Sequence, residues 1–516
     1  MKNKTINQQD WLNTAVFYEI YPQSFYDSDG DGIGDIKGMQ EKLPYLKELG
    51  INAIWINPWY DSPFGDAGYD VRDYYKIAPR YGTNEDARRF LEYAHSLGFH
   101  VILDFVPGHT SVDCEWFKKS CSAEKNEYTD RYIWTKSAWL STDLACLRGI
   151  SDRDGSVAVN YFSHQPALNY GYFDRNADWQ QSVDDEGPKA TRRAMIDVMK
   201  FWIDLGADGF RVDMAGSLVK RDNQDCEGNI AFWRKFRTEL DQELKGKPYV
   251  LISEWGKPDK AIAAGFDMDF LLHVGHRAYM SLFRYEPYFF SGDEESDICV
   301  YADYYDEIYA KTFGKGLICV PSGNHDMWRL AKGKSEAQIK LCMFFLLLNS
   351  GAPFIYYGDE IGMRQFDNIT SVEGGYNRTG ARTPMQWNSG VNYGFSSAEK
   401  TLIPVNIEDD APMVESQLNV KGSLLETVKE LIAFRKSHPA FWARSPYKRV
   451  YAKSHSVPFI FERGEGRDTY TVIINPSKKS VELPVKVKGK TEYVLGGYNE
   501  NTCTIAAVSG VVIKND

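Results

Sequence analysis

The sequence lacks the segments that mark membrane, secreted or zinc-binding proteins. Its longest apolar run, Leu341–Leu348, is less than half of the ~20 residues that a bilayer-spanning helix needs. The N-terminal stretch Met1–Trp11 is polar and contains no apolar core of a signal peptide. The eight cysteines are scattered, without a CxxC pair or a zinc-like spacing. We therefore expect a cytoplasmic protein with reduced thiols and no membrane partner.

Positive charge is also scarce. Lys and Arg number 60 against 71 Asp and Glu, which gives a formal net charge of −11. Nucleic-acid binding depends on clustered Lys and Arg, so we expect no nucleic-acid partner. The remaining composition is typical of a globular protein, and 516 residues can bury one large core and carry a smaller appended domain.

Short apolar runs alternate with helical patterns along most of the chain, which favours a parallel sheet buried on both faces. Seven runs are clear and an eighth lies near Phe266–Leu272, so the pattern predicts a (β/α)8 barrel. An open doubly wound sheet would show the same alternation. The seven runs are Val16–Tyr21, Ile51–Ile56, His100–Val106, Gly209–Met214, Tyr249–Glu254, Leu317–Pro321 and Pro353–Tyr357.

Two parts of the chain depart from this alternation. Residues 107–179 are irregular and too long for a plain connection, so we expect an inserted domain B after the third strand. From residue 438 to 516, short alternating segments and Gly-rich turns predict a C-terminal antiparallel β-sandwich, domain C. The barrel, domain A, would then comprise residues 1–106 and 180–437.

Charged residues stand at the carboxyl ends of four predicted strands, and in a barrel these ends converge on one face. A single such residue is more often a structural ion pair, whereas four converging ends favour an active site. Glycoside cleavage needs one ionised and one protonated carboxyl group. Arg211 would hold Asp213 ionised, and apolar neighbours would raise the pKa of Glu254. These residues alone do not distinguish glycoside cleavage from carbonyl chemistry. The charged strand-end residues are Asp104, His109, Arg211, Asp213, Glu254, His325 and Asp326.

These strand ends form motifs that resemble the four signature regions of the α-amylase family, glycoside hydrolase family thirteen. The resemblance extends from about Val16 to at least Pro439. The signature motifs are Asp104-Phe-Val-Pro-Gly-His109, Gly209-Phe-Arg-Val-Asp213, Ile252-Ser-Glu254 and Asn324-His-Asp326. Others are similar to the oligo-1,6-glucosidase, dextran glucosidase and α-glucosidase (maltase) branch: Phe17-Tyr-Glu-Ile-Tyr-Pro22, Gly68-Tyr-Asp70, Tyr356-Tyr-Gly-Asp-Glu-Ile-Gly-Met363 and Ala381-Arg-Thr-Pro-Met-Gln-Trp387.

The resemblance implies an exo-acting α-glucosidase that retains anomeric configuration through a covalent glucosyl-enzyme, with small α-gluco-oligosaccharides as substrates. It implies Asp213 as nucleophile, Glu254 as acid/base and Asp326 as transition-state stabiliser. It further implies a glucose subsite in which Asp66 pairs with Arg378, or with Arg382 as the alternative, to hold the terminal 4-hydroxyl. The other residues implied around this glucose are Tyr69 stacking beneath it, and Arg211, His109 and His325 supporting its charge and hydroxyls.

An acidic segment near the N-terminus could hold a metal ion. Asp27, Asp29, Asp31 and Asp35 occupy positions 1, 3, 5 and 9 of this segment, and Ile33 offers a carbonyl. Carboxylates this close repel one another unless a hard cation joins them. The segment resembles the calcium loop of the branch, which implies a structural Ca²⁺; a solvated acidic turn is the alternative. We expect no organic cofactor.

The chain departs from the family pattern at several positions. Gly108 replaces the usual Asn before His109, so we expect no ion at the domain B junction, and Ala167 and Thr379 each stand where Asp is usual. The second aromatic platform beside the glucose is not placed. Met214, after the nucleophile, has an apolar bulk that favours α-1,6 bonds, while its flexible thioether leaves α-1,4 bonds open.

Two other functions compete with hydrolysis. A glucosyl transferase or isomerase, of the trehalose synthase or sucrose-isomerising type, would use the same glucosyl-enzyme. A non-catalytic binding module is disfavoured because all three catalytic carboxylates are kept and no membrane span is present. The oligomeric state, monomer or dimer, is left open.

Overall fold

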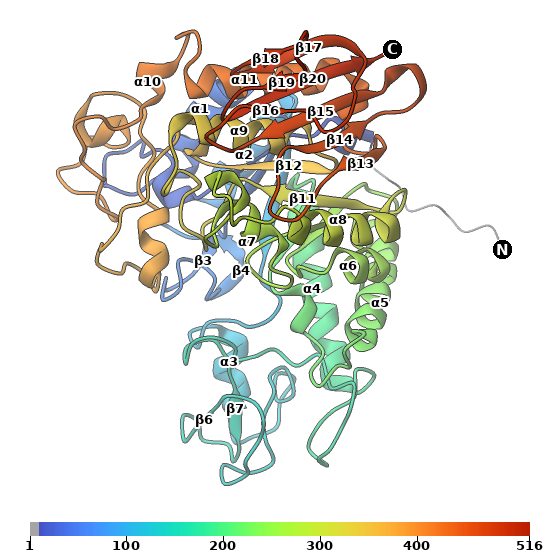
Figure 1. Ribbon diagram of the computed structural model, residues 1–516. Coiled ribbons are helices and arrows are strands. Elements are labelled where there is room, and N and C mark those ends of the chain that lie inside the picture. Colours follow the sequence, from blue (N-terminus) through green and yellow to red (C-terminus); the bar gives the residue numbers. More distant parts are fainter. Residues whose placement is uncertain (1–9) are drawn as a thin grey trace.

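The computed structural model describes residues 10–516, and its centre is a closed barrel of eight parallel strands (Figure 1). The predicted (β/α)8 barrel is confirmed, including its eighth strand, and the open-sheet alternative is wrong. Around the barrel the order is β1-β12-β11-β10-β9-β8-β5-β2. These strands are β1 (Phe17–Ile20), β2 (Ala53–Ile56), β5 (His100–Phe105), β8 (Gly209–Val212), β9 (Val250–Ser253), β10 (Met268–Phe270), β11 (Leu317–Pro321) and β12 (Ala352–Tyr356).

Helices separate the barrel strands and cover their outer face. This is why the strands are apolar without alternation: both of their faces are buried. The helices between strands are α1 (Ile36–Leu49), α2 (Asn84–Ser96), α4 (Glu186–Leu205), α5 (Glu227–Leu244), α6 (Pro258–Ala264), α7 (Ala278–Phe283), α8 (Cys299–Thr312) and α9 (Glu336–Leu348). After β12 the chain adds α10 (Val414–Gln417) and α11 (Leu424–Ser437).

The longest apolar run lies in α9, which is buried along Leu341–Leu348. One side of α9 packs against α11, and Phe344 reaches Gly510 and the ring of Tyr493 in the C-terminal sheet. The run is apolar all round because protein covers both sides of the helix. Within residues 10–516, no helix combines the length and the apolarity needed to cross a bilayer.

The long connection between β5 and β8 carries its own elements, α3 (Glu115–Ser120), β6 (Cys146–Arg148) and β7 (Ser156–Ala158). It has a small separate core that includes Ile133 and Tyr172. In Figure 1 this insertion projects from the barrel at the end opposite the C-terminal sheets. Its last part returns to the barrel, where Tyr172 forms a β-bridge with Lys220. The hairpin β3 (Tyr60–Asp61) and β4 (Asp73–Ile77) lies between β2 and α2.

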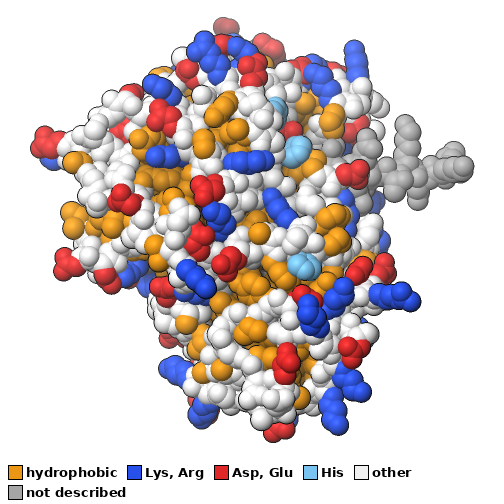
Figure 2. Space-filling view, turned by 90° about the horizontal axis from the view of Figure 1, so that it is seen from above, with side chains coloured by type: hydrophobic (Ala, Val, Ile, Leu, Met, Phe, Trp, Pro, Cys, Tyr) orange, Lys and Arg blue, Asp and Glu red, His pale blue; other side chains and the backbone are white. Residues whose placement is uncertain are grey.

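The C-terminal part forms two antiparallel sheets, as the alternating pattern predicted. The larger has the order β13-β14-β15-β20-β17 and the smaller β16-β19-β18. A small apolar cluster that includes Ile460, Ile505 and Val511 joins them. Their strands are β13 (Tyr447–Tyr451), β14 (Phe459–Arg463), β15 (Tyr470–Asn475), β16 (Val481–Glu482), β17 (Gly489–Leu495), β18 (Tyr498–Asn499), β19 (Thr504–Ile505) and β20 (Ser509–Asn515). On the face shown in Figure 2, acidic and basic side chains are interspersed.

Candidate active site

Arg211 connects the three carboxyl groups at the ends of β5, β8 and β9. Its Nη1 lies 2.9 Å from Asp104 Oδ1 and 2.8 Å from Asp213 Oδ1, and its Nη2 lies 2.8 Å from Glu254 Oε2. The guanidinium is 1% exposed, so this cluster is held in a low-dielectric setting. Because one planar group contacts both Asp213 and Glu254, the two carboxyl groups face the same small space.

One cation facing three carboxyl groups leaves the cluster short of positive charge. The pKa of Asp213 is raised well above its ordinary value, because burial and the neighbouring Glu254 and Asp104 raise it more than Arg211 lowers it. The contact with Arg211 therefore does not by itself keep Asp213 ionised, although the sequence had suggested that it would. Burial likewise raises the pKa of Asp104 despite its contact with Arg211. Such groups titrate as a unit, and the deficit of positive charge favours one proton held among them. Glu254 also accepts a hydrogen bond from the Met214 amide at 3.2 Å, so its surroundings are more polar than the sequence suggested.

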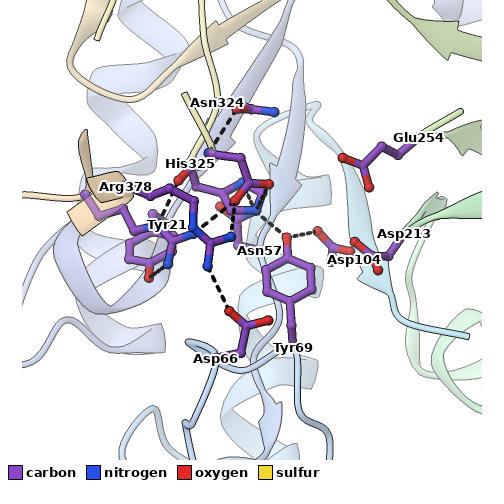
Figure 3. Close-up of polar contacts among 12 residues, drawn as sticks. Tyr21, Asn57, Asp66, Tyr69, Asp104, Asp213, Glu254, Asn324, His325 and Arg378 are labelled. Atoms are coloured by element: carbon purple, nitrogen blue, oxygen red, sulfur yellow. Dashed lines mark hydrogen bonds and ion pairs between the residues drawn. The ribbon is translucent and has the colours of Figure 1, made fainter. Parts of the chain in front are cut away.

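Asp326 lies among three cationic groups, His325, Arg378 and Arg382. Figure 3 shows His325 and Arg378 on the opposite side of Tyr69 from Asp213 and Glu254. Its Oδ1 accepts hydrogen bonds from Arg378 at 2.7 Å and Arg382 at 3.1 Å, and its Oδ2 lies 3.1 Å from His325 Nε2. Burial alone would raise the pKa of Asp326, but His325 and the two arginines outweigh it and hold the pKa well below its usual range. Asp326 is therefore ionised at neutral pH.

His325 is fixed by a carboxylate on each of its ring nitrogens. Its Nδ1 lies 2.8 Å from Glu19 on β1, and its Nε2 faces Asp326. Burial would lower the pKa of His325, but Asp326 and Glu19 raise it to about 9. The imidazole is thus positively charged at neutral pH. Sequence reasoning missed Glu19, although a charged residue inside the apolar run Val16–Tyr21 was a usable signal.

The predicted pocket-closing pair is in contact. Arg378 Nη2 donates to Asp66 Oδ1 at 3.1 Å while its Nη1 donates to Asp326, so one guanidinium joins the two carboxylates. Arg382 contacts Asp326 and the His325 carbonyl, which makes Arg378 the partner of Asp66. Gln165 of the insertion donates to the second oxygen of Asp66 at 2.8 Å.

Tyr69 lies between the two halves of the site in Figure 3. Its ring stacks on His325 with centroids 5.2 Å apart, and its hydroxyl donates to Asp104 at 2.9 Å. His109 lies behind it, with Nε2 3.0 Å from the Tyr69 carbonyl and Nδ1 3.0 Å from the side-chain amide of Asn160. Burial lowers the pKa of His109 to about 4, so this imidazole is neutral at pH 7. Both of its nitrogens are occupied by protein groups.

Tyr161 is a site residue that the sequence did not reveal. It belongs to the insertion and is 61% exposed, and the charges of Asp213, Glu254, Asp326 and Asp66 all act on its hydroxyl. The hydroxyl donates to the Met214 sulfur at 2.8 Å. Tyr161 is therefore an accessible aromatic side chain within electrostatic reach of these carboxylates. No periodicity marks such a residue in an irregular segment.

The acidic segment gathers three of its four carboxylates. Ligand oxygens of Asp27, Asp29 and Asp35 lie within 4.8 Å of one another. Asp31 is outside this group and accepts a hydrogen bond from the Ile33 amide at 2.8 Å. Its pKa is raised by burial and by the three neighbouring carboxylates. Within the group, hydrogen bonds from Ser396 and three backbone amides lower the pKa of Asp27 although burial raises it. Three carboxylates this close together are the oxygen donors that a hard cation such as Ca²⁺ prefers.

Comparison with known proteins shows the family to which this chain belongs. The family model of the α-amylase catalytic domain matches residues 19–443 of this chain. The chain is 32% identical to the trehalose synthase/amylase TreS of Mycolicibacterium smegmatis, over 84% of this chain and 77% of that one. It is 31% identical to an oligo-1,6-glucosidase of Parageobacillus thermoglucosidasius, over 94% of both chains. A solved isomaltulose synthase mutant of Erwinia rhapontici in complex with sucrose superimposes with a TM-score of 0.81 at 26% identity, covering 98% of this chain and 99% of that one. This chain is an enzyme of the α-amylase family, glycoside hydrolase family thirteen.

Proposed function

We propose that this enzyme is a retaining α-glucosidase that removes single glucose units from the non-reducing ends of short α-gluco-oligosaccharides. The observation that carries the proposal is the Arg211 guanidinium, which contacts both Asp213 and Glu254. Retaining glycosidases need their two carboxyl groups only ~5 Å apart, because one attacks the sugar directly and no water stands between them.

In the proposed reaction, Asp213 attacks the anomeric carbon while Glu254 gives its proton to the leaving oxygen. The C1–O bond breaks and a covalent glucosyl-enzyme forms. Glu254 then removes a proton from water, which attacks the same carbon and frees Asp213. Asp326, ionised among His325, Arg378 and Arg382, is preorganised to accept hydrogen bonds from ring hydroxyls as positive charge develops on the sugar.

The Asp66–Arg378 contact supports exo action. It places a carboxylate and a guanidinium side by side at the closed end of the site, next to Asp326. A sugar hydroxyl can donate to the carboxylate and accept from the guanidinium, whereas a continuing glucan chain would find this end blocked. Gln165 holds the carboxylate from the other side.

In this proposal, the linkage preference depends on the side chains of Met214 and Tyr161, which contact each other next to the nucleophile. Met214 follows the nucleophile, and its sulfur is held by the Tyr161 hydroxyl. An apolar residue of this size supports α-1,6 bonds, as does the relative named oligo-1,6-glucosidase. Because the thioether is flexible, α-1,4 bonds belong to the proposal too.

A glucosyl transferase or isomerase is the second candidate. It is favoured by the relative named trehalose synthase/amylase and by the similar isomaltulose synthase structure. The two functions share the glucosyl-enzyme and differ only in whether water or a sugar takes the glucosyl group. We also propose that Asp27, Asp29 and Asp35 hold a structural Ca²⁺, remote from the chemistry.

Proton NMR of the products from maltose, isomaltose, panose, sucrose and trehalose tests the glucosidase and the transferase proposals together. We expect the glucose released from sucrose, whose leaving group is fructose, to appear first as the α anomer, and Asp213→Asn and Glu254→Gln each to lose several orders of magnitude in kcat. A new disaccharide in excess of free glucose would establish the second candidate instead. Glucose that appears from sucrose first as the β anomer would refute the retaining mechanism.

A further inference from the structure

Asp269 is a buried carboxylate in the barrel that the proposed reaction does not use. It lies on β10, next to the strand that leads to Glu254, and its exposed fraction is 0%. Its Oδ1 accepts hydrogen bonds from Ser253 Oγ at 2.6 Å and from the Trp255 amide at 3.0 Å. Its Oδ2 accepts one from the Lys257 amide at 2.9 Å. All three donors are neutral groups.

These donors flank the proposed acid/base. Ser253 directly precedes Glu254, Trp255 directly follows it, and Lys257 lies three residues after Glu254. The strand β9 ends at Ser253, and the amide of Glu254 still donates to Val212 on the neighbouring strand. Beyond that point the carboxylate of Asp269, rather than a neighbouring strand, accepts the hydrogen bonds of the amides of residues 255 and 257. One side chain therefore holds the Ser253 hydroxyl just before Glu254 and two backbone amides just after it.

Keeping a carboxylate at this position is costly for folding. Burial raises the pKa of Asp269 to about 7, although hydrogen bonds from these three donors and from the Phe270 amide lower it. A buried charge without a cation lowers stability, whereas a neutral side chain would avoid that cost. Costly polar groups are typically kept beside reacting groups, where they hold a geometry that catalysis needs.

We propose that Asp269 is a positioning residue that holds Glu254 in line with the leaving oxygen through the backbone of residues 253–257. The inference rests on the proposed function, because it takes Glu254 to be the proton donor. It differs from a merely structural role in one respect. A misplaced acid slows only those reactions in which the leaving group needs a proton.

The test compares two substrates, maltose and α-glucosyl fluoride, whose fluoride leaves with little help from an acid. We expect Asp269→Ala to lower kcat/KM on maltose about 10–100-fold more than on the fluoride, since general acid catalysis contributes ~10²–10⁴-fold. Asp269→Asn keeps one acceptor oxygen and should show a smaller difference in the same direction. Ser253→Ala, which removes one donor, should show a smaller one still.

Asp267→Asn is the matched control. Asp267 lies two residues earlier, is also buried, and accepts a hydrogen bond from the Leu251 amide at 2.9 Å on the same neighbouring strand. It is further from Glu254, so its substitution should affect both substrates equally. Melting temperatures of all variants show which are folded, and Asp269→Asn carries the test if the alanine variant does not fold.

Glu254→Gln separates the two ways in which the idea can fail. If Glu254→Gln favours the fluoride but the Asp269 variants slow both substrates equally, the positioning role is wrong and the proposed function stands. If Glu254→Gln also slows both substrates equally, Glu254 is not the acid, and both proposals are overturned.

Discussion

Substitution of Asp66 by alanine tests whether the site closes on the non-reducing end of its substrate. In the free enzyme Asp66 accepts from Arg378 at 3.1 Å and from Gln165 at 2.8 Å, and its side chain is 10% exposed. A sugar hydroxyl bound by this pair makes hydrogen bonds to charged groups, each worth ~1.5–3 kcal/mol. Loss of one such bond should lower kcat/KM on maltose by about 10–150-fold.

The pair should behave as one unit. Asp66→Ala, Arg378→Ala and the double variant form a thermodynamic cycle, in which the double variant should lose little more than the worse single variant. The assay is glucose release from maltose at substrate concentrations spanning KM. Arg364→Ala is the control, because Arg364 makes a similar double ion pair with Glu408 and Asp410 at the surface. It should remain within about twofold of the unmodified enzyme.

The early products from maltoheptaose give an independent reading. The unmodified enzyme should at first give only glucose and maltohexaose, whereas the Asp66 variant should also give fragments of two to five glucose units, because a longer part of the chain can pass the position of Asp66. The reasoning is refuted if the free-energy losses in kcat/KM of the two single variants add fully in the double variant. It is also refuted if Asp66→Ala has the same kcat/KM on maltose as Arg364→Ala.

Three further predictions concern pH, metal and linkage. Glu360 accepts from two buried tyrosine hydroxyls, and burial raises its pKa to about 7. The stability it contributes is present below its unfolded pKa of about 4.5 and is lost as the pH rises through 7, about 3 kcal/mol in all. The melting temperature of Glu360→Gln should therefore rise relative to the unmodified enzyme over this range; a constant difference would contradict the assignment. Ca²⁺ should raise the melting temperature, and Asp27→Asn should abolish this rise while Asp31→Asn, outside the cluster, keeps it; equal effects would disprove the three-carboxylate site. Met214→Thr should shift the ratio of isomaltose to maltose hydrolysis toward maltose, and an unchanged ratio would mean that this side chain does not set linkage.

The barrel and the charged residues at its strand ends could be predicted because they depend on local patterns, whereas the roles of these residues were implied by the family resemblance. Strands buried on both faces are apolar without alternation, and a charge that ends such a run is conspicuous. Asp213, Glu254 and His325 were found in this way. Glu19 carried a similar signal, but its partner is 306 residues away, and nothing in the sequence pairs two such positions.

The parts of the site that were missed come from irregular segments. Tyr161, Asn160 and Gln165 lie in the insertion, where backbone turns rather than a repeating period decide the direction of each side chain. Asp269 could not be identified from the sequence for another reason. It stands within the weakest predicted strand, and its importance appears only when β9 and β10 are seen to be neighbours.

The contact from Gln165 to Asp66 has a consequence for how this enzyme could diverge. The contacts around Asp66, which we propose close one end of the site, come jointly from the insertion, from the loop that carries Asp66 and from the segment that carries Arg378. An efficient open groove for long polymers would require all three to change together, whereas a single substitution such as Asp66→Ala would weaken binding of short substrates and admit longer chains only inefficiently. A descendant lineage would therefore pass through poor short-chain enzymes before it could acquire an endo-acting one.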